Sequence, residues 1–239
     1  MKNTQPVYHR ILLKLSGEAL SGEGGFGVGA ESLDRIASSI RDLHQLGIEI
    51  GMVIGGGNLF RGEALAHHGF DRITSDQIGM MATIMNGLAL RDRFLRIGLP
   101  THVMSSIAVQ GIVETYDRSL AMSYLKAQHI VIFVGGTGCP LFSTDSAASL
   151  RGIEMGADVI LKATKVDGVY SEDPKSNPDA QRFDRLTYQD VLEKQLKVMD
   201  ATAICLTRDY HMPLRIFNMN TPGILKKIVL GSNDGTRIE

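Results

Sequence analysis

Cysteine is scarce in this chain, with only Cys139 and Cys205 among 239 residues. Two thiols can form at most one disulfide, and their separation matches no metal-binding spacing. The composition therefore excludes a disulfide-built secreted scaffold and a cysteine-based zinc module. We expect both thiols to be reduced and the protein to be cytoplasmic.

Long apolar runs and an excess of one charge are also absent. No apolar run reaches the roughly 18 residues of a transmembrane helix, and residues 1–8 are too polar for a signal peptide. Lys and Arg number 25 against 26 Asp and Glu, which gives a net charge of −1. A general nucleic-acid binder would usually carry a basic excess. We expect a soluble intracellular protein with neither a membrane nor nucleic acid as a partner.

The P-loop signature is missing, because no glycine precedes a lysine anywhere in the chain. The run Gly22-Glu23-Gly24-Gly25-Phe26-Gly27 does fit the pattern G-x-G-x-x-G. It begins about seven residues beyond the first predicted strand, however, whereas a dinucleotide site needs a tight strand–turn–helix connection. The spacing favours a flexible loop.

What the chain does contain is an alternation of strands and helices. Near-continuous apolar runs, typical of parallel strands covered on both faces, predict strands at 11–13, 48–54, 101–104, 130–134, 159–161 and 214–217. Helical spacing of apolar residues predicts helices at 33–43 (stopped at Gly47), 73–97, 144–155, 187–194, 199–209 and 222–229. This order predicts a doubly wound α/β sandwich.

Two further expectations concern organisation. No Pro/Ser-rich linker divides the chain, and the polar segment 166–182 is interpreted as an excursion from the sheet, so residues 1–239 are predicted to form one domain. In the helix at 73–97, core packing is expected for one apolar stripe, made of Ile78, Met81, Ala82, Met85, Leu88 and Ala89.

A triple glycine follows the strand at 48–54. Gly55, Gly56 and Gly57 leave bare backbone N–H groups at the carboxyl end of a strand, where open α/β sheets bind ligands. Arg61 adds a fork of donors suited to phosphate. A phosphate-handling enzyme is the first hypothesis, and a glycine-rich turn with a solvated arginine is the alternative.

Lys14 lies inside the first apolar strand, where a lysine is costly unless an anion neutralises it. The alternative is a lysine that extends to solvent at the strand end. A second glycine turn, 135–138, follows the strand at 130–134, and Thr144 or Asp145 can begin the next helix, whose free N–H groups attract phosphate. Asp145 beside phosphate would need a cation, either a lysine or Mg²⁺. Alternatively, Thr144 or Asp145 is simply an N-cap.

The segment 161–174 brings lysines, hydroxyls and the ring of Tyr170 after another strand, an edge suited to adenine and ribose. Together with the three segments above, it resembles the bacterial uridylate kinases (UMP kinases) of the amino-acid kinase family. The resemblance runs in order through KLSGE (14–18), GGGNLFRG (55–62), MMATIMNGLALRD (80–92), GTGCPLFSTDSAA (136–148), 157–170, LKVMD (196–200) and FNMN (217–220).

The resemblance implies a three-layer α/β/α sandwich around a mainly parallel sheet. It also implies the reaction ATP + UMP → ADP + UDP, with Mg²⁺ bound together with ATP, in pyrimidine nucleotide biosynthesis. By the same resemblance, the catalytic residues are Lys14, Asp145, Arg61 and Lys162. The ATP-binding residues are Lys14, Leu15, Ser16, Gly17, Gly57, Arg61, Thr164, Tyr170 and Asp173. The UMP-binding residues are Gly56, Asp76, Thr137, Gly138, Cys139, Phe142 and Thr144.

Regulation and assembly are implied in the same way. The family is activated by GTP, inhibited by UTP and forms homohexamers, and the Gly22–Gly27 loop resembles its GTP-contacting region. No metal ligands of the protein itself are predicted. For the second lysine that related kinases use in catalysis, Lys162, Lys165 and Lys197 are candidates, with Lys162 preferred.

The sequence departs from the family pattern in the acceptor region. Cys139 stands where asparagine is expected, and a thiol is a poor substitute for an amide as a hydrogen-bonding group. Ser75 and Gln77 flank Asp76 where glycine and histidine are common. The same motifs would suit two other functions: a sibling kinase that phosphorylates a carboxylate or carbamate, and a storage or sensor protein for nucleotides or oxyanions. Asp76 opposes the first, and Lys14 with Asp145 opposes the second.

Overall fold

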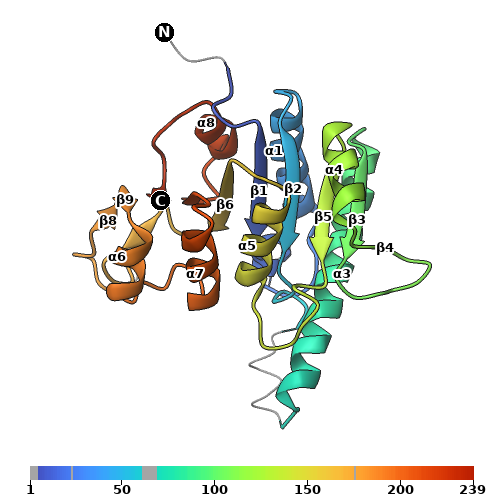
Figure 1. Ribbon diagram of the computed structural model, residues 1–239, viewed down its shortest axis with the longest axis horizontal. Coiled ribbons are helices and arrows are strands. Elements are labelled where there is room, and N and C mark those ends of the chain that lie inside the picture. Colours follow the sequence, from blue (N-terminus) through green and yellow to red (C-terminus); the bar gives the residue numbers. More distant parts are fainter. Residues whose placement is uncertain (1–4, 23, 61–68, 175) are drawn as a thin grey trace.

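A nine-stranded sheet runs through the centre of the protein (Figure 1). The computed structural model describes residues 5–22, 24–60, 69–174 and 176–239. The strand order is β4-β3-β5-β2-β1-β6-β10-β11-β9. The strands span Arg10–Leu15 (β1), Glu49–Ile54 (β2), Thr101–Ser105 (β3), Glu114–Thr115 (β4), Ile130–Val134 (β5), Val159–Thr164 (β6), Arg185–Leu186 (β9), Leu214–Asn218 (β10) and Thr236–Ile238 (β11).

The sheet is mainly parallel, as predicted. Every neighbouring pair in it is parallel except β10 with β11. All six predicted apolar runs are strands, and together they form the contiguous centre of the sheet: β3, β5, β2, β1, β6 and β10. Strands β2 and β5 are buried along their whole length, because helices cover both faces.

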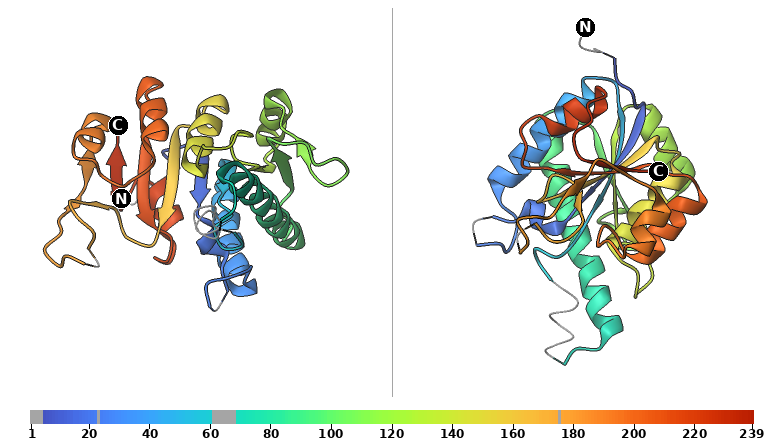
Figure 2. Two further views of the ribbon diagram at one scale, coloured as in Figure 1. Left: turned by 90° about the horizontal axis from the view of Figure 1, so that it is seen from below. Right: turned by 90° about the vertical axis from the view of Figure 1, so that its left-hand side faces the viewer.

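Helices form a layer on each face of the sheet (Figure 2). On one face lie α1 (Ala30–His44), α3 (Arg72–Arg96) and α8 (Ile224–Val229), which pack with Ile11, Leu13 and Leu15 of β1. On the other face, Leu12 of β1 packs with α4 (Arg118–Lys126), α5 (Thr144–Glu154), α6 (Tyr188–Glu193) and α7 (Ala201–Asp209). The predicted three-layer α/β/α sandwich is confirmed. Among the described residues, no helix is both long and apolar enough to cross a membrane.

The face that helix α3 presents to the sheet agrees only in part with the predicted stripe: Ala82 is buried and Leu88 packs against the core, as predicted. Met81 and Met85 are 45% and 53% exposed, so they do not pack in the core. The buried face instead carries Met80, Ala82, Thr83, Ile84, Asn86, Gly87, Leu90 and Phe94. A Cβ on Gly87 would come within 2.6 Å of Val134 Cγ1, so small and polar residues face the sheet where the helix lies closest. Hydrophobic periodicity misses a face of this kind.

Several short elements of the structure were not predicted from the sequence. Helix α4 and the strands β4, β9 and β11 were not predicted, nor was the antiparallel pair β7 (Val169–Tyr170) and β8 (Arg182–Phe183) in the polar segment 166–182. A two- or three-residue strand has too few side chains to show a period. The 3₁₀-helix η1 (Gly17–Leu20) follows β1 directly. Strands β1, β2, β5 and β6 are parallel, so their carboxyl ends lie at the same edge of the sheet. The segments that carry the candidate site residues follow these strand ends.

Candidate active site

Two lysines lie side by side at the carboxyl edge of the sheet. Lys14 of β1 and Lys162 of β6 are register partners on neighbouring parallel strands. Side chains alternate along a strand, so Lys14 lies on the same face as Leu12, toward α5. Lys14 is only 7% exposed. Two buried ammonium groups this close need an anion between them.

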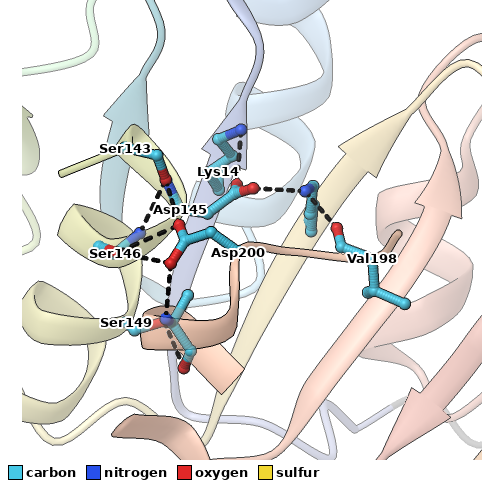
Figure 3. Close-up of polar contacts among 9 residues, drawn as sticks. Lys14, Ser143, Asp145, Ser146, Ser149, Val198 and Asp200 are labelled. Carbon is cyan, nitrogen blue, oxygen red and sulfur yellow. Dashed lines mark hydrogen bonds and ion pairs between the residues drawn. The ribbon is translucent and has the colours of Figure 1, made fainter. Parts of the chain in front are cut away.

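Asp145, in the first turn of α5, supplies that anion (Figure 3). Its Oδ1 pairs with Lys14 Nζ at 2.7 Å, and its Oδ2 pairs with Lys162 Nζ at 2.7 Å. Burial alone would raise the pKa of Asp145, but the charges of Lys14 and Lys162 outweigh it and hold that pKa below its usual value. Asp145 is therefore a carboxylate shared by two cations.

Lys162 also donates to the carbonyl of Val198, at 2.5 Å. Burial lowers the pKa of Lys162; Asp145 raises it and Lys14 lowers it, with a net shift below the usual lysine value. Lys165 pairs with Glu18 at 2.6 Å, and Lys197 lines a cavity described below. Of the three candidate lysines, Lys162 is the one that shares Asp145 with Lys14.

Ser143 fixes the start of α5. Its Oγ accepts from the backbone N–H groups of Asp145, at 2.9 Å, and Ser146, at 3.3 Å, and so forms the N-cap. The interpretation of Thr144 or Asp145 as the N-cap is wrong, and Asp145 is thereby left to bind the lysines. Ser143 also donates to Asp200, the N-cap of α7. Asp200 accepts from Ser146 Oγ as well, at 3.0 Å, so α5 and α7 are joined at their N-termini (Figure 3).

A small cavity of about 130 Å³ opens between the two glycine turns and α3. Four residues of the predicted acceptor set line it: Gly56, Asp76, Phe142 and Thr144. Also on its wall are Phe60, Ser75, Gly79, Met80, Thr83 and Gly136. The other members of the set, Thr137, Gly138 and Cys139, lie on the turn after β5 and outside this lining.

Asp76 is held from two sides. Arg72 Nε donates to both of its carboxylate oxygens at 3.1 Å, and the backbone N–H of Leu141 donates to Oδ2 at 2.9 Å. Cys139 is exposed with a free thiol, and its N–H donates to Thr137 Oγ1 at 3.2 Å. Asp76 therefore ties α3 to the turn that carries Cys139.

A larger cavity of about 570 Å³ lies beyond the end of β6. Thr164, Tyr170 and Asp173, the predicted ATP-nucleoside residues, all line it together with Lys162. The segment 194–198 forms the opposite wall. Thr144, which precedes Asp145, lines the small cavity, so the Lys14–Asp145–Lys162 cluster stands between the two cavities.

The triglycine turn packs against the end of β1. A Cβ on Gly17 would come within 2.6 Å of Gly57 N, so only glycine permits this approach. Ser16 lies beside it, lining a small surface cavity, whereas Leu15 is fully buried and its carbonyl accepts from Gly55 N at 2.9 Å. The prediction for Arg61 lies outside the described residues.

The predicted regulatory segment is described except for Glu23, which lies outside the described residues. Gly24, Gly25 and Gly27 all have positive φ, and Phe26 at the surface is 70% exposed. The Gly27 N–H donates to the carbonyl of Asn58 at 3.0 Å. The loop therefore lies against the triglycine turn.

Several supporting residues were missed by sequence reasoning. Thr83 Oγ1 accepts from Gly135 N at 2.8 Å, and Ser106 Oγ donates to Gly136 O at 2.8 Å. Buried Arg151 donates to Ser106 Oγ at 2.9 Å and lies over the ring of Tyr116. These residues are recognised by their burial and by the side of the helix on which they lie, and both are tertiary properties that the sequence does not display.

The next feature concerns the side chains that could ligate a metal ion. Within the described ranges, no group of three His, Cys, Asp or Glu side chains could hold a metal ion. Both Asp145 oxygens are paired with lysines, and Asp200 accepts from two serines and a backbone N–H. Asp145 and Asp200 are therefore both engaged by protein groups.

A family model described as the amino acid kinase family matches residues 9–218. The chain belongs to the amino acid kinase family. The match spans the sheet from the first residues before β1 to the end of β10, and therefore includes the lysine–aspartate cluster and both cavities.

Relatives within this amino acid kinase family are close. The uridylate kinase of Yersinia enterocolitica is 57% identical over 236 residues, which cover 99% of this chain and 95% of that protein. The uridylate kinase of Serratia proteamaculans is 56% identical, covering 99% and 98%. The resemblance to uridylate kinases drawn from the motifs is confirmed.

Solved structures agree with this placement. The UMP kinase of Bacillus anthracis superposes with a TM-score of 0.94 at 42% identity, covering 97% of this chain and 96% of that one. The UMP kinase of Ureaplasma parvum gives a TM-score of 0.91 at 33% identity, covering 97% and 98%. The amino acid kinase fold predicted from the motifs is confirmed.

Proposed function

We propose that this protein is a UMP kinase, which transfers the γ-phosphoryl group of ATP to UMP and yields ADP and UDP in pyrimidine nucleotide biosynthesis. The observation that carries the proposal is the Lys14–Asp145–Lys162 cluster between a small cavity and a larger one. The high identity to uridylate kinases over nearly the whole chain supports the choice of UMP.

In the proposed reaction, a phosphate oxygen of UMP bonds to the γ-phosphorus of ATP, and the bond from that phosphorus to the β–γ bridging oxygen breaks. The electron pair leaves with ADP. The acceptor oxygen is already an anion, so no general base is required. Catalysis then consists of positioning and charge neutralisation. Lys14 and Lys162 provide the cations, and Asp145 fixes their positions.

We assign one substrate to each of the two cavities. We place the ATP nucleoside in the large cavity against Thr164, Tyr170 and Asp173, with its phosphates toward the Ser16–Gly17 and Gly57 backbones and Arg61. UMP occupies the small cavity, with Asp76 accepting from ribose hydroxyls and with Gly56, Phe142 and Thr144 around it. Thr137, Gly138 and Cys139 close over UMP from the neighbouring turn.

Mg²⁺ enters with ATP, and its chemistry is to neutralise charge on the phosphate oxygens. We further propose one domain over residues 1–239, a cytoplasmic location, a homohexameric assembly, activation by GTP and inhibition by UTP. The continuous sheet supports the single domain. The exposed Met81 and Met85 on α3 support a self-contact there. GTP is assigned to the Gly22–Gly27 loop.

The deciding experiment measures ADP release from ATP and Mg²⁺ with five acceptors: UMP, CMP, dTMP, acetylglutamate and carbamate, each with and without GTP. We expect turnover with UMP alone, stimulated by GTP. Turnover with acetylglutamate or carbamate would assign the sibling-kinase function. Nucleotide binding without turnover of any acceptor would assign the storage or sensor function.

A matched pair of variants on α3 tests the proposal that Asp76 binds the ribose of UMP. Asp76 accepts from Arg72 and Asp92 accepts from Arg96, each four residues away. Asp76→Asn is expected to raise the apparent KM for UMP at least about tenfold, the cost of a lost hydrogen bond to a charged group, whereas Asp92→Asn leaves it unchanged. Equal KM values in the two variants would overturn the assignment.

A further inference from the structure

Two buried amides form a closed hydrogen-bonded pair between the triglycine turn and α3. Asn58 follows the turn and is 1% exposed; Asn86 lies within α3 and is fully buried. Asn86 Nδ2 donates to Asn58 Oδ1 at 2.7 Å, and Asn58 Nδ2 donates to Asn86 Oδ1 at 3.0 Å. Each amide is therefore both donor and acceptor to the other.

The remaining amide hydrogens reach two other segments. Asn86 Nδ2 donates to Gly55 O at 2.8 Å, which holds the triglycine turn to α3. Asn58 Nδ2 donates to Gly27 O at 2.7 Å, and Gly27 N donates to Asn58 O at 3.0 Å. All four side-chain N–H groups of the pair have acceptors, so the network is complete.

Asn58 also lies against Gly17 of η1, which follows the strand that carries Lys14. A Cβ on Gly17 would come within 2.5 Å of Asn58 Oδ1 and 2.9 Å of Asn58 N. The pair thus joins four segments: the residues after β1, the turn 55–58, helix α3, and the loop formed by Gly24–Gly27. The hydrogen bonds among Asn58, Asn86 and Gly55 are buried, and the one from Asn58 to Gly27 O is part-buried, with its donor on a side chain that is 1% exposed. Breaking the contact to Gly27 therefore leaves a buried amide N–H without its acceptor. A displacement of the loop must either move Asn58 or leave buried groups unpaired.

We propose that the Asn58–Asn86 pair is a positioning element that couples the Gly24–Gly27 loop to the phosphate-side turn, so that the position of the loop sets the rate of phosphoryl transfer. This inference rests on the proposed function for its kinetic consequence. The coupling itself is a property of the hydrogen bonds. Neither asparagine lines the two cavities proposed to hold the substrates, and both act through the backbone of Gly55 to Gly57.

Alanine at Gly27 would strain the backbone of the loop without a steric clash. Gly27 has φ +76° and Gly47, at the end of α1, has φ +77°, and an added Cβ meets no atom within 4 Å at either position. Alanine therefore strains both backbones equally. We expect Gly27→Ala to lower kcat about tenfold, since small misplacements remote from the chemistry cost up to about 10²-fold. We expect Gly47→Ala to lower Tm by as much as Gly27→Ala does and to keep the wild-type kcat.

Asn58→Asp tests the route of the coupling. This substitution keeps the size and the acceptor for Asn86 but removes both donors, including the one to Gly27 O. We expect kcat to fall by a similar factor, and the double variant Gly27→Ala with Asn58→Asp to be no slower than Asn58→Asp alone. Losses that multiply would show independent effects and overturn the proposal.

Amide hydrogen exchange separates this proposal from the proposed function, because it needs no substrate. Leu59 N and Phe60 N both donate to Gly56 O at 3.0 Å and report on the turn. Their exchange is expected to accelerate in Gly27→Ala and not in Gly47→Ala. This result stands even if the wild-type protein does not phosphorylate UMP or if Asn58→Asp fails to fold. Unchanged exchange in Gly27→Ala would overturn the coupling.

Discussion

Asp145 is the single residue on which both lysines of the site depend, since each of its oxygens pairs with one of them at 2.7 Å. Asp145→Asn keeps the shape and removes the charge between two buried cations. By comparison with cationic groups in phosphoryl transfer, we expect kcat to fall on the order of 10³-fold, while UMP still binds. Steady-state kinetics and UMP titration measure the two effects. A variant with near-wild-type kcat would show that the cluster is only structural.

Lys162 provides a pH signature. Its pKa lies below the usual lysine value because burial outweighs the attraction of Asp145. On the alkaline side, kcat should therefore fall at a lower pH than an ordinary lysine predicts. Between the pKa of Lys162 in the folded protein and the ordinary lysine pKa, the free energy of unfolding rises with pH. The reason is that the unfolded chain still binds a proton that the folded one has released.

The pH profile of Lys162→Arg is the control for this prediction. A guanidinium stays protonated through that range, so the alkaline fall in kcat should disappear even if the maximal rate is lower. An identical alkaline limb in the wild type and in Lys162→Arg would assign the titration to another group.

At the scale of secondary-structure elements, the start of α5 decides where Asp145 lies. Ser143 caps α5 and is bonded to Asp200, the cap of α7. Ser143→Ala should lower the free energy of unfolding by about 1 kcal/mol, as for other N-caps, and should lower kcat as well. Asp117, which caps α4 through Leu120 N at 2.7 Å, is the matched control. Asp117→Ala should cost similar stability, and its kcat should remain that of the wild type.

Denaturant unfolding and kinetics on the same two samples test this difference. If Ser143→Ala and Asp117→Ala lose equal stability and keep equal kcat, the cap has no role in placing Asp145. Helices α5 and α7 share one capping network through Ser143 and Asp200, whereas Asp117 caps α4 through Leu120 N.

At the scale of the whole molecule, α3 exposes Met81 and Met85 one turn apart. An exposed apolar pair on a long helix suits contact with a second copy. We expect light scattering to give the wild-type protein a mass several times the 26.0 kDa of one chain. Met85→Glu should reduce that mass, and Tyr210→Glu, at a 63% exposed position after α7, should not. A monomeric wild type would refute the proposed assembly.

The sequence by itself determined the local architecture. Strands β1, β2, β3, β5, β6 and β10 were predicted because a buried parallel strand is apolar along its length, and the glycine turns at 55–57 and 135–138 were predicted because bare backbone has a recognisable composition. The motifs around Lys14 and Asp145 identified the family. These are properties of short segments, so neighbouring residues are enough to show them.

Only the tertiary structure decided which distant residues meet. The pairing of β1 with β6 sets Lys14 beside Lys162, and the capping of α5 by Ser143 turns Asp145 toward both. The face of α3 that packs on the sheet was predicted only in part. Ala82 lies on it as predicted, but Thr83, Asn86 and Gly87 are also buried there, while Met81 and Met85 are exposed. Strand register and the buried face of α3 depend on packing across the whole chain, and local periodicity does not determine either of them.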